Sequence, residues 1–220
     1  MKRRSLLKAA VLGGGAALAA PAIAKGLLEW RMVTSWPNGL PGLGAGAERL
    51  AANISAMSGG RLTLKVYAAG ELVPALECFG AVANGTAQLG HDAAYYHTGK
   101  SEGAPFFTTF PFGFTTAELD AWIKFGNGQK LWDELYAPFG IRAFHAGSTG
   151  TQMLGWFRKE IRSLEDLKGL KFRAPGNQGR VLAKLGATPV TLPGGEIFPA
   201  LQSGAIDAAE WIGPYNDLAL

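Results

Sequence analysis

The residue best suited to chemistry is Arg173, within the segment Lys171-Phe172-Arg173-Ala174-Pro175-Gly176. The residues before it predict a short strand over Leu170–Arg173, and Pro175-Gly176 predicts a turn immediately after that strand. In open α/β sheets, ligands bind beyond the carboxyl ends of the strands. A guanidinium at such a position can hold a carboxylate through two parallel charge-assisted hydrogen bonds, which lysine cannot supply. Arg173 is therefore a candidate carboxylate-binding residue, although an ordinary ion-paired surface arginine would have the same local sequence.

A second candidate site lies at Gly42-Leu43-Gly44-Ala45-Gly46-Ala47, which follows a predicted strand and begins a predicted helix. This arrangement invites comparison with the G-x-G-x-x-A loop that binds the pyrophosphate of dinucleotides. The preceding loop Pro37–Pro41 is longer than the tight turn of that motif, and two prolines stiffen it. We therefore favour an ordinary helix start built from small residues, and keep an exported dinucleotide-dependent oxidoreductase as the alternative.

Other patterns for catalysis or metal binding do not occur in the sequence. The three histidines, His91, His97 and His145, lack the spacing of a zinc site, and there is no G-x-S-x-G or G-x-x-x-x-G-K motif. The single cysteine, Cys78, lies in a mainly apolar run and is predicted to be a small buried core residue. A hydrolase or a kinase would need a constellation of residues that this sequence does not contain.

The first part of the chain alternates strands and helices. The period of the apolar residues predicts strands over residues 30–35, 61–67 and 88–90 and helices over 43–57 and about 74–83. This β-α-β-α-β order indicates a sheet with helices on its faces. An irregular phenylalanine-rich segment follows, and then a helical pattern over Thr116–Leu135 that is interrupted at Gly126–Gly128.

The alternation of strands and helices begins again after a further predicted strand over Ile141–His145. The later predicted elements are strands over residues 153–157, 170–173, 189–192 and 208–212 and helices over 163–167, 178–185 and 197–203. A Gly/Ser/Thr cluster places a domain boundary near residues 147–152. Residues 25–147 are thus predicted to form a first lobe, and residues 148–220 a second.

Residues 1–24 have the features of an export signal. A basic segment, Met1–Lys8, precedes an apolar stretch and the small-residue sequence Ala22-Ile23-Ala24, which predicts cleavage before Lys25. The apolar stretch is about 12 residues long, whereas a membrane-spanning helix needs about 20. The pair Arg3-Arg4 resembles the twin-arginine signal of proteins exported in folded form, and an ordinary secretory signal remains open. Either route places the mature protein outside the cytoplasm.

The net charge of +4 belongs to this leader. Its four basic residues account for the whole excess, because residues 25–220 carry equal numbers of basic and acidic side chains. A nucleic-acid-binding surface needs clustered Lys and Arg on the folded protein. The composition therefore argues against nucleic acid as a partner.

The segments around Arg173 and after it carry a family resemblance. Phe172–Gly176 and Thr191–Trp211 are similar to the corresponding segments of the extracytoplasmic solute-binding subunits of TRAP (tripartite ATP-independent periplasmic) transporters. Glu210–Asp217 resembles in particular the branch that binds 2-oxo acids such as pyruvate, and similar segments occur along essentially the whole mature chain. The resemblance implies an α/β fold of the periplasmic-binding-protein type, with two lobes that close on a ligand and mixed sheets flanked by helices.

The resemblance also implies a ligand site. Arg173 would form a salt bridge with the substrate carboxylate, and Gln152 would contact both the substrate and a bound sodium ion. Glu210 and Trp211 would be the other cation ligands, the tryptophan through its backbone carbonyl, and oxygen donors suit such an ion. The rings that would complete the substrate contacts are those of Trp211, Tyr95 and Tyr96, although buried phenols with a structural role are an equal alternative for the two tyrosines.

The implied function is transport rather than catalysis. The protein would bind a small carboxylate in the periplasm and deliver it to TRAP membrane subunits, with no organic cofactor and no nucleic acid as partner. The full-length form would be a homodimer. The chain is expected to continue beyond Leu220 in a longer protein, with a C-terminal portion that completes both lobes and adds cation ligands.

Overall fold

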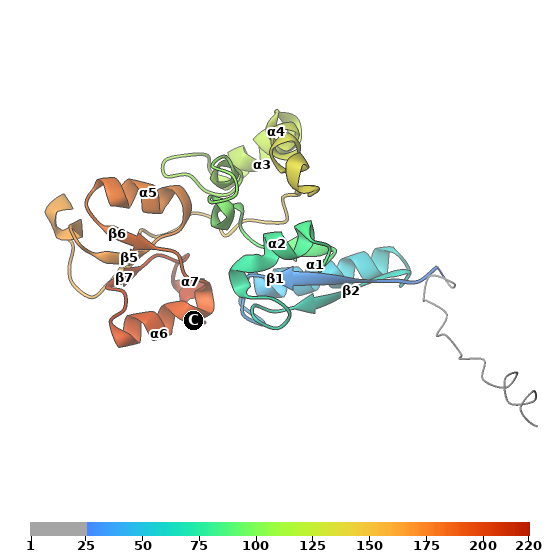
Figure 1. Ribbon diagram of the computed structural model, residues 1–220, viewed down its shortest axis with the longest axis horizontal. Coiled ribbons are helices and arrows are strands. Elements are labelled where there is room, and N and C mark those ends of the chain that lie inside the picture. Colours follow the sequence, from blue (N-terminus) through green and yellow to red (C-terminus); the bar gives the residue numbers. More distant parts are fainter. Residues whose placement is uncertain (1–25) are drawn as a thin grey trace, which may run out of the picture.

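The structure is a computed structural model that describes residues 26–220 (Figure 1). The leader and the cleavage site predicted before Lys25 lie outside the described residues. Within residues 26–220, no helix combines the length and the apolar character needed to cross a bilayer. Two sheets, one from each half of the chain, form the framework that positions Arg173 and its neighbours.

The first sheet is parallel, with the strand order β2-β1-β3. Its elements are β1 (Leu28–Thr34), α1 (Gly44–Met57), β2 (Leu62–Tyr67), α2 (Cys78–Ala83) and β3 (Leu89–His91). Met32 lies in the central strand, opposite Val66 on one side and Leu89 on the other, and it is buried. The predicted β-α-β-α-β order is confirmed, with a 3-10 turn at Ala75–Glu77 where the helical prediction began.

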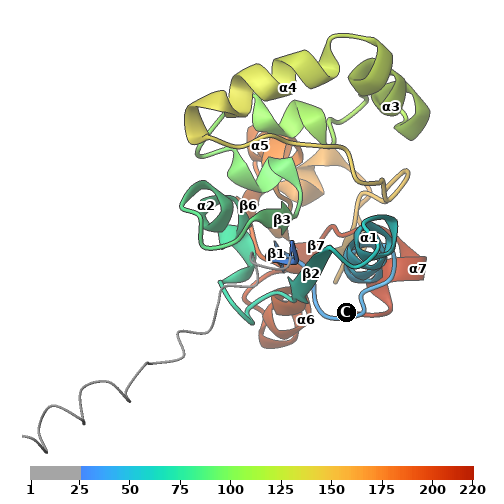
Figure 2. The ribbon, with the colours of Figure 1, turned by 90° about the vertical axis from the view of Figure 1, so that its right-hand side faces the viewer.

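A helical layer follows the first sheet. Helix α3 (Thr116–Phe125) and helix α4 (Gly128–Tyr136) are separated at the predicted glycine interruption. A Cβ at Gly128 would lie 2.7 Å from the Cα of Ile123, so this tight corner between the helices requires glycine. Phe107 stacks between Trp122 and Trp132 beneath the pair, at ring distances of 5.5 and 4.9 Å. Figure 2 shows that α3 and α4 lie together at one end of the molecule, away from α6 and α7.

The strand predicted over Ile141–His145 is wrong. Residues 141–150 have no regular secondary structure, and they connect α4 to the second sheet. Ile141 and Ala143 alternate with polar residues because they pack against the apolar cluster of α3 and α4, and not because they face one side of a sheet. The carbonyl of Ala143 accepts a hydrogen bond from Gln129 Nε2 (2.8 Å), so a helix side chain takes the place of a neighbouring strand.

The second sheet is mixed, with the order β4-β7-β5-β6. Its elements are β4 (Trp156–Phe157), β5 (Lys171–Arg173), α5 (Gly176–Lys184), β6 (Thr188–Val190), α6 (Gly194–Ser203), β7 (Ala208–Ala209) and α7 (Pro214–Asp217). Strand β5 is parallel to both β6 and β7, whereas β4 is antiparallel to β7. The outer strands are shorter than predicted, although Met153 N–H still donates to the Ile212 carbonyl (2.9 Å) beyond them.

One apolar cluster joins the two sheets. Trp36 and Leu40 follow β1, and they pack with residues from the second sheet and its helices, among them Ile197, Trp211 and Ile212. The domain boundary predicted near residues 147–152 falls in the irregular segment between the sheets. The carboxyl ends of β1 and β5 are thus held close to the same cluster.

Cys78 lies in the core of the first sheet, as predicted, and is a free thiol. Burial raises the pKa of this thiol to about 12. Because the thiolate is the reactive form, we expect iodoacetamide at about pH 8 to leave Cys78 unmodified in the folded protein. Mass spectrometry after unfolding in guanidinium should show complete modification. Modification of the folded protein at the rate of the unfolded one would contradict this burial.

Candidate ligand-binding site

Arg173 is fully buried at the carboxyl end of β5. Its Nε donates to the Leu192 carbonyl (3.0 Å), and its Nη2 donates to the Tyr96 hydroxyl (3.2 Å). Its Nη1 donates twice to Glu210, to the backbone carbonyl (2.7 Å) and to the carboxylate oxygen Oε2 (3.1 Å). The position at a strand end agrees with the sequence prediction, and the complete burial excludes a surface arginine.

Glu210 is the acidic residue paired with Arg173, and its side chain is also buried. Burial raises the pKa of Glu210 to about 8, although the guanidinium of Arg173 acts in the opposite direction. The second carboxylate oxygen, Oε1, is buried without a hydrogen-bond partner among the described residues. A buried acceptor left in this state costs about 1–3 kcal/mol. Glu210 Oε1 is therefore an oxygen atom that could bind a cation or accept a hydrogen bond.

Trp211 packs on the face of the Arg173 guanidinium, with the guanidinium carbon 4.9 Å from the ring centre. Its Nε1 donates to Asn216 Oδ1 (2.6 Å), and Asn216 Nδ2 donates to the carbonyl of Pro41. Asn216 is fully buried. Sequence reasoning missed Asn216, although it belongs to the segment Glu210–Asp217 that carried the family resemblance. This side chain connects Trp211 to the loop between β1 and α1.

The first half of the chain contributes aromatic rings to the same place. The ring of Trp36 lies 6.3 Å from that of Tyr96 and 6.3 Å from that of Trp211. Tyr95 and Tyr96 are in edge contact with each other at 4.6 Å, and burial raises the pKa of both phenols. Trp36 Nε1 donates to His91 Nδ1 (2.8 Å), and burial lowers the pKa of this histidine, which favours the neutral ring that such an acceptor requires. Neither Trp36 nor His91 was among the predicted site residues.

Two glycines allow the close approach of these groups. Gly176 begins α5 with a φ of +63°, and a Cβ there would lie 2.8 Å from the Cβ of Tyr95. A Cβ at Gly194 would lie 2.9 Å from the ring of Trp211. A larger residue at either position would therefore push an aromatic ring away from Arg173.

Gln152 is placed differently from the other predicted site residues. Its Nε2 donates to Thr149 Oγ1 (3.0 Å), and no hydrogen bond within residues 26–220 joins it to Arg173, Glu210 or Trp211. The adjacent Met153 pairs with Ile212, so the backbone of Gln152 runs beside the chain that follows Trp211. The structure therefore brings together Arg173, Tyr96, Glu210 and Trp211, with Tyr95 beside Tyr96. The bond to Thr149 uses the amide nitrogen and leaves the amide oxygen as the atom that could bind a cation, so the role of Gln152 stays a prediction.

The donor set decides which cation these residues suit. Across residues 26–220, no group of three or more His, Cys, Asp or Glu side chains is close enough to hold a metal ion. Amide and backbone carbonyl oxygens would thus have to complete a site at Glu210. Oxygen ligands of this kind suit hard cations rather than zinc or copper.

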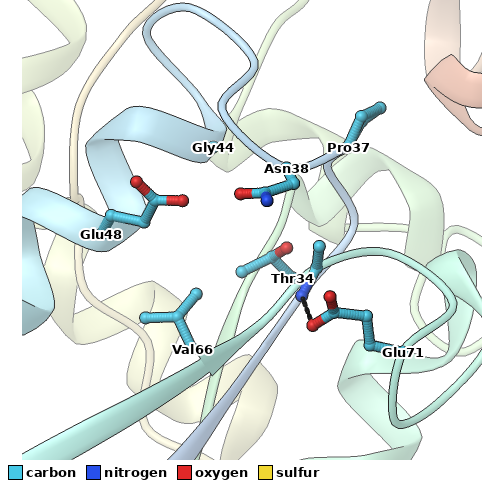
Figure 3. Close-up of a pocket in the computed structure, with 8 residues that line it drawn as sticks. Thr34, Pro37, Asn38, Gly44, Glu48, Val66 and Glu71 are labelled. Carbon is cyan, nitrogen blue, oxygen red and sulfur yellow. Dashed lines mark hydrogen bonds between the residues drawn. The ribbon is translucent and has the colours of Figure 1, made fainter.

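A separate cavity of about 180 Å³ lies near the start of α1, where the sequence suggested a dinucleotide site (Figure 3). Glu48 and Glu71 line it, and Figure 3 shows the side chains of Glu48 and Asn38 directed toward one another across it. Glu71 Oε2 accepts a hydrogen bond from the backbone N–H of Ala68 (2.8 Å). Two carboxylates would repel a pyrophosphate here, so the cavity does not favour the dinucleotide alternative.

Comparison with known proteins identifies relatives of most of the chain. Residues 32–218 match the model of the DctP family, described as "Bacterial extracellular solute-binding protein, family 7". The chain is 50% identical over 190 residues to the monocarboxylate 2-oxoacid-binding periplasmic protein of Nostoc sp.. The aligned residues make up 86% of this chain and 52% of that protein. The chain thus spans about half the length of this curated relative.

Solved structures show the same likeness. A TRAP periplasmic solute-binding protein from Pseudoalteromonas atlantica, with bound sodium and pyruvate, matches with a TM-score of 0.86 and 46% identity over 88% of this chain and 59% of that one. A relative from Colwellia psychrerythraea, with bound calcium and pyruvate, matches with a TM-score of 0.84 and 44% identity over 88% and 59% of the two chains. The predicted α/β fold of the periplasmic-binding-protein type is confirmed.

The family match and the structural likeness agree with each other over nearly all of residues 26–220. The members are solute-binding receptors of transport systems and not enzymes, so the family match contradicts the alternative of an oxidoreductase. The chain belongs to the DctP family of bacterial extracellular solute-binding proteins, the solute-binding subunits of TRAP transporters.

Proposed function

We propose that the protein captures a small monocarboxylate, of the 2-oxo acid class that includes pyruvate, for a TRAP transporter. The observation that carries this proposal is the buried Arg173 at the carboxyl end of β5, in contact with groups from both halves of the chain. A buried guanidinium is a strong attractor for a carboxylate, because the low dielectric strengthens their interaction. The ligands bound by the relatives from Pseudoalteromonas and Colwellia support the same class.

The ligand would be held between the two halves of the chain. Tyr96 contacts Arg173 from the first half, Trp211 covers the guanidinium from the second, and the ring of Trp36 lies near the rings of both. A ligand that contacts both halves favours the arrangement in which they are closed upon it. The rings of Tyr96 and Trp211 beside one buried guanidinium favour a ligand with few atoms.

The cation would bind beside the carboxylate. Glu210, the carbonyl of Trp211 and the amide oxygen of Gln152 are the proposed ligands, and Glu210 Oε1 is free to serve. Relatives hold either sodium or calcium together with pyruvate. We favour sodium for this chain, because the proposed site provides one carboxylate whereas calcium sites commonly use several.

The family supports a place of action outside the cytoplasm. The members are extracellular or periplasmic, and the proposed leader, with its twin arginines, would direct this protein to the periplasm. Membrane subunits of the transporter would receive the ligand. A homodimer of the full-length protein is supported by a relative from Bordetella bronchiseptica whose structure is described as a dimer.

Calorimetric titration of the full-length mature protein tests this function. We expect pyruvate to bind in a sodium-containing buffer, and a sugar acid such as glucuronate to bind at least about tenfold more weakly, a difference of about 1.4 kcal/mol. Heat from glucuronate but not from any monocarboxylate would overturn the assigned ligand class. A bound dinucleotide in the absorbance spectrum of the purified protein would overturn the transport function itself.

A further inference from the structure

The hydrogen bonds of Arg173 leave little of its guanidinium free. Arginine has five N–H donors in a fixed planar fork. Nε and Nη1 use all three of their donors on Leu192 and Glu210, and one Nη2 donor goes to Tyr96. In the described residues, only one Nη2 donor is then left. A carboxylate that needs two neighbouring donors cannot be held by Arg173 until one of these partners moves.

Of the two acceptors on Nη1, the carboxylate of Glu210 is the one more readily displaced. The carbonyls of Leu192 and Glu210 belong to backbone that is fixed beside the sheet, where Glu210 N–H donates to the Arg173 carbonyl (2.9 Å). The carboxylate of Glu210 is on a side chain, and its bond to Nη1 is the longer of the two on that nitrogen, 3.1 against 2.7 Å. It is also the chemical group that a ligand carboxylate would replace. Both carboxylates cannot bind Nη1 side by side without strong repulsion.

The displaced carboxylate needs compensation. Glu210 is buried, and its Oε1 has no hydrogen-bond partner within residues 26–220, so release from Arg173 would leave an unpaired charge in the interior. Such a charge is very unfavourable unless an opposite charge replaces the lost one. A cation that binds the carboxylate of Glu210 supplies this charge.

We propose that Glu210 is an exchange residue that makes carboxylate binding depend on the cation. Without a cation, its carboxylate occupies Nη1 of Arg173 and competes with the ligand. With a cation, Glu210 turns to the ion and releases Nη1 to the ligand carboxylate. This inference rests on the proposed function and adds to it that the carboxylates of Glu210 and of the ligand compete for Nη1 of Arg173. A residue that only coordinates the cation would not hinder ligand binding when the cation is absent.

The test compares Glu210→Gln with the wild-type protein by calorimetric titration with pyruvate, with sodium or with choline as the only cation. The two buffers have the same pH and the same ionic strength, so that the cation is the only difference between them. In choline, we expect the variant to bind pyruvate about tenfold more tightly than the wild type, because a neutral amide is a weaker competitor for Nη1. The variant should also lose the dependence on sodium.

A matched control is Glu196→Gln, which removes an exposed carboxylate from the first turn of α6. It should behave as the wild type in both buffers. The exchange would be overturned if, in choline, Glu210→Gln bound pyruvate no more tightly than the wild type does. It would also be overturned if pyruvate binding by the variant depended on sodium as it does in the wild type. Failure of the wild type to bind pyruvate in sodium would instead refute the proposed function.

A second measurement uses the wild-type protein and so does not depend on the folding of the variant. Nitrogen-15 NMR of the Arg173 guanidinium, assigned by comparison with Arg173→Lys, follows Nη1 while sodium is added without pyruvate. We expect a saturable change of the Nη1 resonance as Glu210 leaves it. An Nη1 resonance that stays constant throughout the sodium titration would overturn the proposal.

Discussion

Replacement of Arg173 by lysine is expected to weaken pyruvate binding by at least about a hundredfold, the equivalent of about 3 kcal/mol. Lysine keeps the positive charge, but it is a point donor that cannot form two parallel bonds with a carboxylate. The substitution also removes the hydrogen bonds that the guanidinium of Arg173 donates to Leu192 and Tyr96, and these bonds orient it. Calorimetric titration in sodium measures the change, with circular dichroism to confirm that the variant is folded.

Arg180→Lys is the matched control for this substitution. Arg180 lies on α5, is half-exposed, and pairs with the exposed Glu102 at 3.0 Å. Exposed pairs of this kind contribute about 0–1 kcal/mol, so neither affinity nor stability should change much. Equal dissociation constants for Arg173→Lys and Arg180→Lys would remove Arg173 from the binding site.

Trp211 is expected to have the second large effect, in this case on stability as well as on binding. Trp211→Ala should lower the free energy of unfolding by about 3–5 kcal/mol, because it empties a buried ring site. Trp211→Phe should cost about 1–3 kcal/mol, because it leaves the buried Asn216 Oδ1 without its donor. Urea unfolding of each variant measures these losses.

Trp156→Phe provides the comparison for Trp211→Phe. Trp156 also donates its Nε1 to a side chain, Asp217 Oδ2 at 2.6 Å, but this bond is exposed to solvent. Water can replace the lost donor there, so we expect a change within about 0.5 kcal/mol. If the two phenylalanine variants are equally stable, the connection from Trp211 through Asn216 to Pro41 does not stabilise the fold.

Much of the fold was predictable because its signals are local. Helix α1 was predicted from apolar residues three and four apart, and β2 from strict alternation, since these periods follow directly from backbone geometry. The position of Arg173 at a strand end was predictable for the same reason, because the turn residues Pro175-Gly176 follow immediately. The strand predicted over Ile141–His145 failed because its alternation comes from contact with α3 and α4, which a local pattern cannot distinguish from a sheet.

The arrangement of the site was harder to predict because it depends on contacts between distant segments. Asn216 and Pro41 are 175 residues apart in the sequence. Trp36 and Trp211, whose rings are also in contact, are equally far apart in the sequence. No local period records such contacts. The pairing of Glu210 with Arg173, and the bond between Gln152 and Thr149, likewise required the three-dimensional structure.

The pairing of two buried charges also constrains how such a receptor could change its ligand during evolution. A site for an uncharged solute has no use for Arg173, yet loss of Arg173 alone would leave the buried Glu210 without its partner. Loss of Glu210 alone would likewise leave the buried Arg173 without an oppositely charged partner. Apolar replacement of both residues together is often neutral or stabilising in buried pairs. A change from an anionic to a neutral ligand would therefore require the two positions to be substituted in concert.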